Sequence, residues 1–159
     1  MSNYISANLS PDDQKRALEL IAELRKIFSF GIKLNNSTKR GMPMLDDGRR
    51  PFAAKALQYG GSEPKIVAPY TDLKELKVDL DLYDALGPVE MEALSFTEMI
   101  SDTRMAAGSD AYVTALAIYK SAKGALKSGV PGTQSIVDEL SKLFEYQGKS
   151  PKDSIASKG

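Results

Sequence analysis

The chain contains no histidine, no cysteine and no tryptophan among its 159 residues. The absence of cysteine excludes disulfides, thiolate nucleophiles and zinc sites built on cysteine. The absence of histidine excludes Ser-His-Asp and Cys-His catalytic arrangements, and the usual ligands of catalytic zinc. An enzyme of this composition would have to rely on carboxylates, Lys, Tyr, Ser or a metal ion bound by oxygen. The composition therefore favours a non-enzymatic protein with no cofactor.

The chain also lacks a net charge, because 21 basic residues balance 21 acidic ones. This balance argues against a surface that binds a polyanion everywhere, although a local basic patch stays open. No apolar run approaches the roughly 20 residues that a membrane-spanning helix needs. The first eight residues carry no basic segment followed by an apolar one, as a signal peptide would. We therefore expect a cytoplasmic protein with no membrane partner.

What the chain does contain is a series of segments with apolar residues at helical spacing, each bounded by cap or turn residues. Ser10-Pro11-Asp12-Asp13 is typical of a helix start, and Thr71-Asp72 starts a later helix. Gly87-Pro88 and Gly129-Val130-Pro131 are typical of breaks between helices. The predicted helices span about residues 11–30, 72–86, 88–107, 109–128 and 131–146, and a shorter one follows the cap residues 46–48 and ends at Gly60-Gly61.

These segments predict an all-α fold, a bundle of five to six helices that are mostly antiparallel. The helical domain should cover residues 11–146, after an N-terminal arm at 1–10 and before a disordered tail at 147–159. Residues 35–47 form a long polar connection, the best candidate for a mobile loop. The predicted core comprises Leu20, Leu24, Ile27, Phe28, Leu57, Leu73, Leu76, Leu80, Ala93, Phe96, Ile100, Leu116, Tyr119, Ile136 and Leu140.

The segment 72–86 carries apolar residues on two sides. One stripe contains Leu73, Leu76, Leu80 and Tyr83, and a second stripe on nearly the opposite side contains Val78, Leu82 and Ala85. A helix with two apolar faces is either central in a bundle or half-exposed at a partner surface. Both interpretations stay open, and the second makes Val78, Leu82 and Ala85 the candidate interface.

Charge is segregated along the chain. Residues 72–107 carry nine acidic residues against three basic ones, so the rest of the chain carries the compensating positive charge. The basic residues that flank the polar connection are Lys39, Arg40, Arg49 and Arg50, and Lys120, Lys123 and Lys127 line the end of the segment 109–128. Such separation suits self-association or an oppositely charged protein partner. Weak nucleic-acid binding through the basic residues of 39–50 is an alternative, although no aromatic motif interleaves with them.

Two further side-chain patterns bear on chemistry. Two pairs of acidic residues with i,i+4 spacing, Glu75 with Asp79 and Glu98 with Asp102, would lie at matching heights in a hairpin about Gly87-Pro88. Together they could hold Mg²⁺, Mn²⁺ or Ca²⁺, but a solvated acidic face explains them as well. Tyr112, Leu116 and Tyr119 share one helix face, as core side chains or as part of a ligand site.

The chain also resembles small uncharacterised helical proteins of bacteria. The resemblance is carried by Ala-Ala-Gly-Ser-Asp-Ala-Tyr-Val-Thr-Ala-Leu-Ala-Ile-Tyr-Lys-Ser-Ala-Lys at 106–123 and its continuation at 127–140, with shorter matches at 52–57 and 67–70. It implies a bacterial origin and an all-helical fold, and it assigns no activity. Together these observations predict a helical interaction or assembly protein that self-associates. A divalent-metal or small-ligand binding protein or enzyme based on carboxylates is the alternative.

Overall fold

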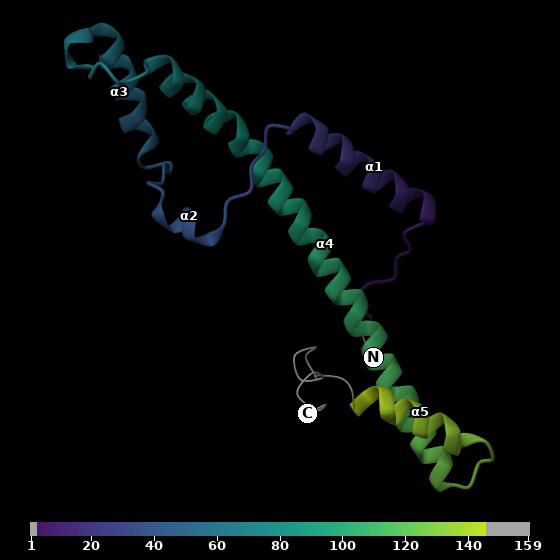
Figure 1. Ribbon diagram of the computed structural model, residues 1–159. Helices are drawn as coiled ribbons and strands as arrows, with labels where there is room; N and C mark the ends of the chain where they lie inside the picture. Colours follow the sequence, from purple (N-terminus) through teal and green to yellow (C-terminus); the bar gives the residue numbers. More distant parts are fainter. Residues whose placement is uncertain (1–2, 146–159) are drawn as a thin grey trace, which may run out of the picture. The chain divides into compact units, whose positions relative to one another are not determined.

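The computed structural model describes residues 3–145, and helices are the regular elements throughout that range (Figure 1). The elements are α1 at Pro11–Ile27, α2 at Asn36–Gly41, α3 at Arg50–Ser62, the short 3₁₀ helix η1 at Pro64–Ile66, α4 at Leu73–Lys127 and α5 at Thr133–Glu145. The predicted all-α class is confirmed, whereas the bundle arrangement stays a prediction. The predicted tail at 147–159 lies outside the described residues.

The helix α1 begins where its cap residues predict. The Asp13 backbone N–H donates to the Ser10 hydroxyl at 3.0 Å, and Pro11 occupies the first turn. The helix ends at Ile27, three residues before the predicted end, and the Phe28 N–H donates to the Leu24 carbonyl. Basic side chains in its last turn complement the negative end of the helix dipole.

The segment 35–47, predicted to be a mobile loop, contains the short helix α2. The Asn35 side chain caps this helix by accepting from the Thr38 backbone N–H at 2.8 Å. The next helix, α3, continues past Gly60-Gly61 to Ser62, and the Glu63 N–H donates to the Tyr59 carbonyl at 2.8 Å. The presence of α2 and the later end of α3 both have a local cause. At these helix ends, hydrogen bonds from a side chain or from the backbone satisfy N–H or C=O groups that would otherwise bond to water.

The helix α4 runs without interruption from Leu73 to Lys127, so the predicted breaks at Gly87-Pro88 and near Gly108 are wrong. Three predicted helices are one element of 55 residues. Pro88 removes a single backbone donor, and Gly87 lacks the Cβ that would crowd the proline ring. Strong helix formers such as Ala106 and Ala107 precede Gly108, whose cost is about 1 kcal/mol relative to alanine. The long helical pattern on both sides therefore outweighs the local break signals.

The chain divides into two units. In the unit formed by residues 7–99, the end of α3 lies near the start of α4 and the two helices diverge from there (Figure 1), and Leu80 is buried with 4% of its surface exposed. In the described part of the other unit, residues 3–6 and 100–145, Val137 of α5 is buried. The prediction of a single domain stays a prediction.

Most of the predicted core is not buried. Of the fifteen residues predicted, Leu80 alone is buried, while large side chains such as Leu24, Phe96 and Ile136 are about half exposed. Periodicity shows which face of a helix is apolar, but burial also needs a second element against that face. Along much of α1 and α4, the described chain supplies no such element.

Candidate interaction site

The two apolar stripes at the start of α4 differ in exposure. On the first stripe, Leu80 is buried, Leu73 and Leu76 are half-buried, and the Tyr83 hydroxyl donates to the Leu45 carbonyl at 3.3 Å. The second stripe is exposed and contains Val78 at 57%, Leu82 at 40% and Ala85. The chain covers Leu73, Leu76 and Leu80 on the first stripe, whereas Tyr83, at 36%, and the second stripe are exposed.

The contacts of α3 explain why the first stripe is covered. The Arg50 guanidinium, at the start of α3, forms two hydrogen bonds with the Asp84 carboxylate, one of them from Nε at 2.8 Å. At the other end of α3, Gly60 is buried against Leu73. These two contacts, near both ends of α3, hold it along one side of α4.

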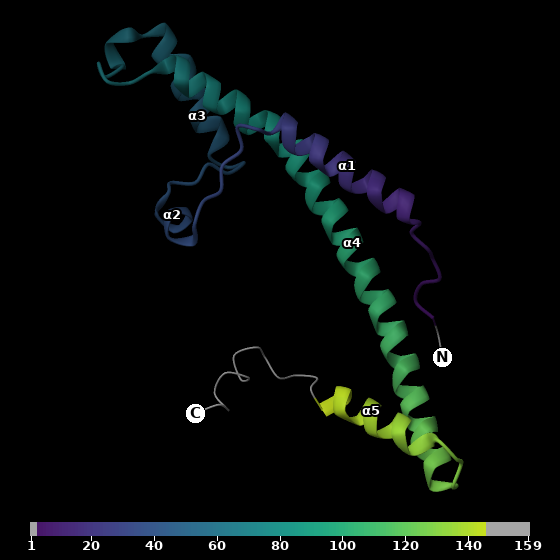
Figure 2. The same cartoon turned by 45° about the vertical axis from the view of Figure 1, so that its right-hand side comes forward.

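Farther along α4 the exposed stripe continues into a groove that α1 and α4 line together. We call it the α1–α4 groove. Its volume is about 560 Å³, and the last turns of α1 lie nearer to α4 than its first turns do (Figures 1 and 2). Val89 belongs to both features, since it lies seven positions after Leu82 and therefore on the same helix face. The apolar lining comes from Ile21, Leu24 and Phe28 of α1 and from Leu86, Val89 and Ala93 of α4.

Of the eight residues that line the groove, six are apolar and two are charged. Leu24 and Val89 are 53% and 43% exposed, so the two helices do not close on each other. Arg25 lines the groove from α1 and Glu90 lines it from α4. None of the ion pairs within residues 3–145 involves Arg25 or Glu90. The groove therefore offers an open apolar surface flanked by one positive and one negative side chain.

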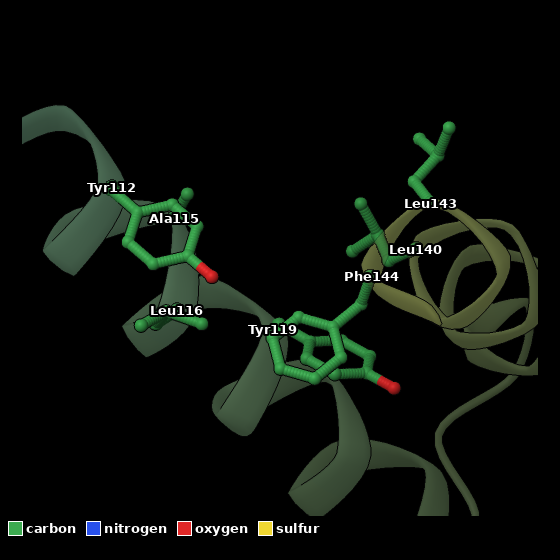
Figure 3. A pocket seen from close by; sticks show the side chains of 7 residues that line it. All are labelled: Tyr112, Ala115, Leu116, Tyr119, Leu140, Leu143 and Phe144. Atoms are coloured by element: carbon green, nitrogen blue, oxygen red, sulfur yellow. The ribbon is translucent and has the colours of Figure 1, made fainter. Parts of the chain in front are cut away.

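A smaller pocket of about 180 Å³ lies between α4 and α5 in the other unit (Figure 3). The rings of Tyr119 and Phe144 lie against each other with centroids 5.9 Å apart, and the Lys123 ammonium lies 4.4 Å from the Tyr119 ring centre. Tyr112, Leu116 and Tyr119 line this pocket together, as their predicted shared face requires. Its lining is apolar and aromatic, and it is completed by Ala115, Leu140 and Leu143.

The four basic residues predicted as a patch do not behave alike. Lys39 and Arg40 are exposed in the last turn of α2. Arg49 pairs with Asp46 at 3.0 Å, and Arg50 pairs with Asp84. The hydrogen bond from Arg50 lowers the pKa of Asp84 below its ordinary value, and the same bond raises the pKa of Arg50. Two of the four positive charges are thus engaged by carboxylates of the chain.

The two acidic pairs predicted as a weak alternative metal site do not converge. Their hairpin required a break at Gly87-Pro88, and α4 has none. Asp79 and Glu98 are nineteen positions apart on one helix, or about 28 Å at a rise of 1.5 Å per residue. Within residues 3–145, no three acidic side chains are placed to hold a metal ion. Glu75 and Asp102, the outer members of the pairs, are exposed.

The α1–α4 groove is a feature that the sequence pattern did not predict. Its signal is a seven-residue spacing on both helices, from Ile21 to Phe28 and from Leu86 to Ala93, which is typical of helices that pack along a seam. The second spacing crosses Pro88, where the sequence predicts a break. Because the sequence predicts a helix end at Pro88, Leu86 and Ala93 fall in two different predicted helices. The spacing that indicates the groove is therefore not recognised.

Comparisons with known proteins do not assign a function to these surfaces. A scan against protein-family models and searches of curated proteins and of solved structures found no match. The resemblance to small helical proteins of bacteria stays a prediction. Among the described helices, none is both long enough and apolar enough to cross a membrane.

Proposed function

We propose that this chain is a non-enzymatic helical interaction protein that self-associates through the exposed stripe of α4. The observation that carries the proposal is the contrast between Leu80, which is buried, and Leu82, which is 40% exposed two positions later. Fully burying a leucine contributes about 1.5–3 kcal/mol. An exposed stripe of Val78, Leu82 and Ala85 therefore gives a driving force for association. The lack of histidine and cysteine supports a role without catalysis.

The proposal is also compatible with the antiparallel bundle expected from the sequence, because the bundle can form between two copies of the chain. A bundle needs helices on each side of an apolar face. On the exposed stripe, a second copy can supply the missing helices. Association then completes between copies the packing that the sequence pattern predicts within one chain.

The test is the solution mass, measured by light scattering over a concentration series at low and high salt. We expect a defined oligomer for the wild-type chain, and a smaller, still helical species for Leu82→Glu, because a buried carboxylate at the stripe opposes association. The matched control is Met91→Glu, which places the same charge roughly 180° away around the helix. Met91 is 72% exposed, and the control should keep the wild-type mass.

Two outcomes contradict the proposal. A wild-type chain that stays monomeric at every concentration shows that the stripe does not mediate self-association. Loss of association in both Leu82→Glu and Met91→Glu shows that added charge on α4 is sufficient to prevent it, and that the stripe has no special role. Circular dichroism of both variants checks that the helices are retained.

A further inference from the structure

The two walls of the α1–α4 groove carry opposite charge. Arg25 is on the α1 wall. Glu90 is on the α4 wall, within the acidic segment 72–107. A partner that fills the groove must offer an apolar strip and also an acidic group beside α1 and a basic group beside α4.

The groove itself has this composition. Each wall contributes apolar side chains over two helical turns, from Ile21 to Phe28 and from Leu86 to Ala93, together with one charged side chain. When two identical surfaces meet across a two-fold axis, residue i of one copy contacts residue j of the other, and j contacts i. If the α1 wall of one copy faces the α4 wall of the other, apolar strips meet and each Arg25 meets a Glu90.

We propose that the α1–α4 groove is occupied by the α1–α4 groove of a second copy, so that Arg25 of each copy pairs with Glu90 of the other. This inference rests on the proposed self-association and identifies the surface and the orientation that mediate it. The four helical segments brought together form a four-helix contact around the apolar strips. The stripe of Val78, Leu82 and Ala85 continues into this contact, since Val89 lies on the same face of α4.

Charge reversal tests the pairing directly. Arg25→Glu places two acidic groups opposite each other at both contacts, and Glu90→Arg places two basic groups there. We expect each single variant to dissociate at least roughly tenfold more readily than the wild type at low salt, because like charges face each other. Mixing the two variants makes both contacts attractive again, as does combining the substitutions in one chain. Both the mixture and the double variant should recover association.

The control and the readout separate this inference from the proposed function. Lys26→Glu makes the same charge change at a position that does not line the groove, and it should keep the wild-type dissociation constant. Dissociation constants come from sedimentation equilibrium of each protein and of the one-to-one mixture. Circular dichroism confirms that each variant is folded.

If the wild type associates and neither Arg25→Glu nor Glu90→Arg weakens it, the groove is not the interface, and self-association through another surface stands. If both variants weaken association and neither the mixture nor the double variant restores it, the two-fold pairing is wrong. If the wild type does not associate, the proposed function fails, and this inference fails with it.

Discussion

At the scale of single residues, the bond between Arg50 of α3 and Asp84 of α4 connects two residues that are 34 positions apart in sequence. The sequence places Arg50 in a basic patch because its neighbours Arg49, Lys39 and Arg40 are also basic. Local composition gives the charge of a residue but not its partner across the fold. That Asp84 is the partner of Arg50 follows only from the position of α3 beside α4.

The Arg50 bond predicts a measurable pKa change at Asp84. Its carboxyl has a pKa below the ordinary 3.8 because the Arg50 hydrogen bond stabilises the charged form. Arg50→Ala should return the pKa of Asp84 toward the ordinary value, as measured by NMR titration of the carboxyl carbon. Arg49→Ala is the control, because Arg49 pairs with Asp46 and should leave Asp84 unchanged. An unchanged pKa in Arg50→Ala would contradict the bond.

The lowered pKa of Asp84 also determines how its contribution to the stability of the fold changes with pH. A carboxyl whose pKa is lower in the folded than in the unfolded chain stabilises the fold at pH values above the ordinary pKa of 3.8. That contribution is lost as pH falls through the folded pKa of Asp84. Chemical unfolding at pH 7 and at pH 3 should therefore show a smaller acid-induced loss in Asp84→Asn than in the wild type. Because both side chains are partly exposed, the difference should be small.

Gly60 and Gly61 are adjacent in α3 and should respond differently to alanine. A Cβ at Gly60 would lie 2.9 Å from Cδ2 of Leu73, whereas a Cβ at Gly61 would meet no atom within 4 Å. Gly61→Ala should stabilise the protein by about 0.4–1 kcal/mol through reduced unfolded-state freedom. Gly60→Ala should gain less or destabilise, since Leu73 must move. Urea unfolding measures both, and equal gains would show that α3 does not pack closely on Leu73.

At the scale of elements, the continuous helix α4 contains a proline at Pro88. Proline in a helix interior is less favourable than alanine by about 3 kcal/mol, because a hydrogen bond is lost and the ring crowds the preceding turn. Pro88→Ala should therefore raise the free energy of unfolding by up to about 3 kcal/mol. The measurement is chemical unfolding followed by far-UV circular dichroism.

Gly108→Ala is the comparison for Pro88→Ala. Gly108 lies within α4, and a Cβ there would meet no atom within 4 Å, so alanine should gain about 1 kcal/mol and no more. A separate helix that began at Pro88 would instead lose its favourable starting residue on substitution. In that case Pro88→Ala would destabilise the protein, and α4 would be two elements.

Helix starts with a capping side chain were predicted well, whereas the starts predicted at Pro88 and Ser109 and most of the predicted burial were wrong. Ser10 caps α1 as expected, and Asp72 accepts the Lys74 backbone N–H at 2.8 Å at the start of α4. A start is determined by a side chain that bonds a neighbouring backbone N–H, so it can be recognised in the sequence. Burial of Leu24 or Phe96 depends on distant segments or on another molecule, and no local pattern contains that information.

At the scale of the whole molecule, two large apolar side chains are buried among the described residues, Leu80 and Val137. Fully burying a side chain of this size contributes about 1.5–3 kcal/mol. Self-association through the stripe and the α1–α4 groove would bury further apolar side chains and would therefore add to the stability of the folded chain.

Stabilisation by self-association predicts that the melting temperature rises with protein concentration. For a dimer that unfolds to monomers, each tenfold rise in concentration adds about 1.4 kcal/mol to the folded state. For a chain of this length, about 1 kcal/mol shifts the melting temperature by roughly 2–4 °C. Scanning calorimetry over a hundredfold range should therefore show a rise of several degrees, and Met91→Glu should show the same rise. A melting temperature that is independent of concentration would mean that one chain folds alone, because mass action requires the shift for any oligomer that dissociates on unfolding.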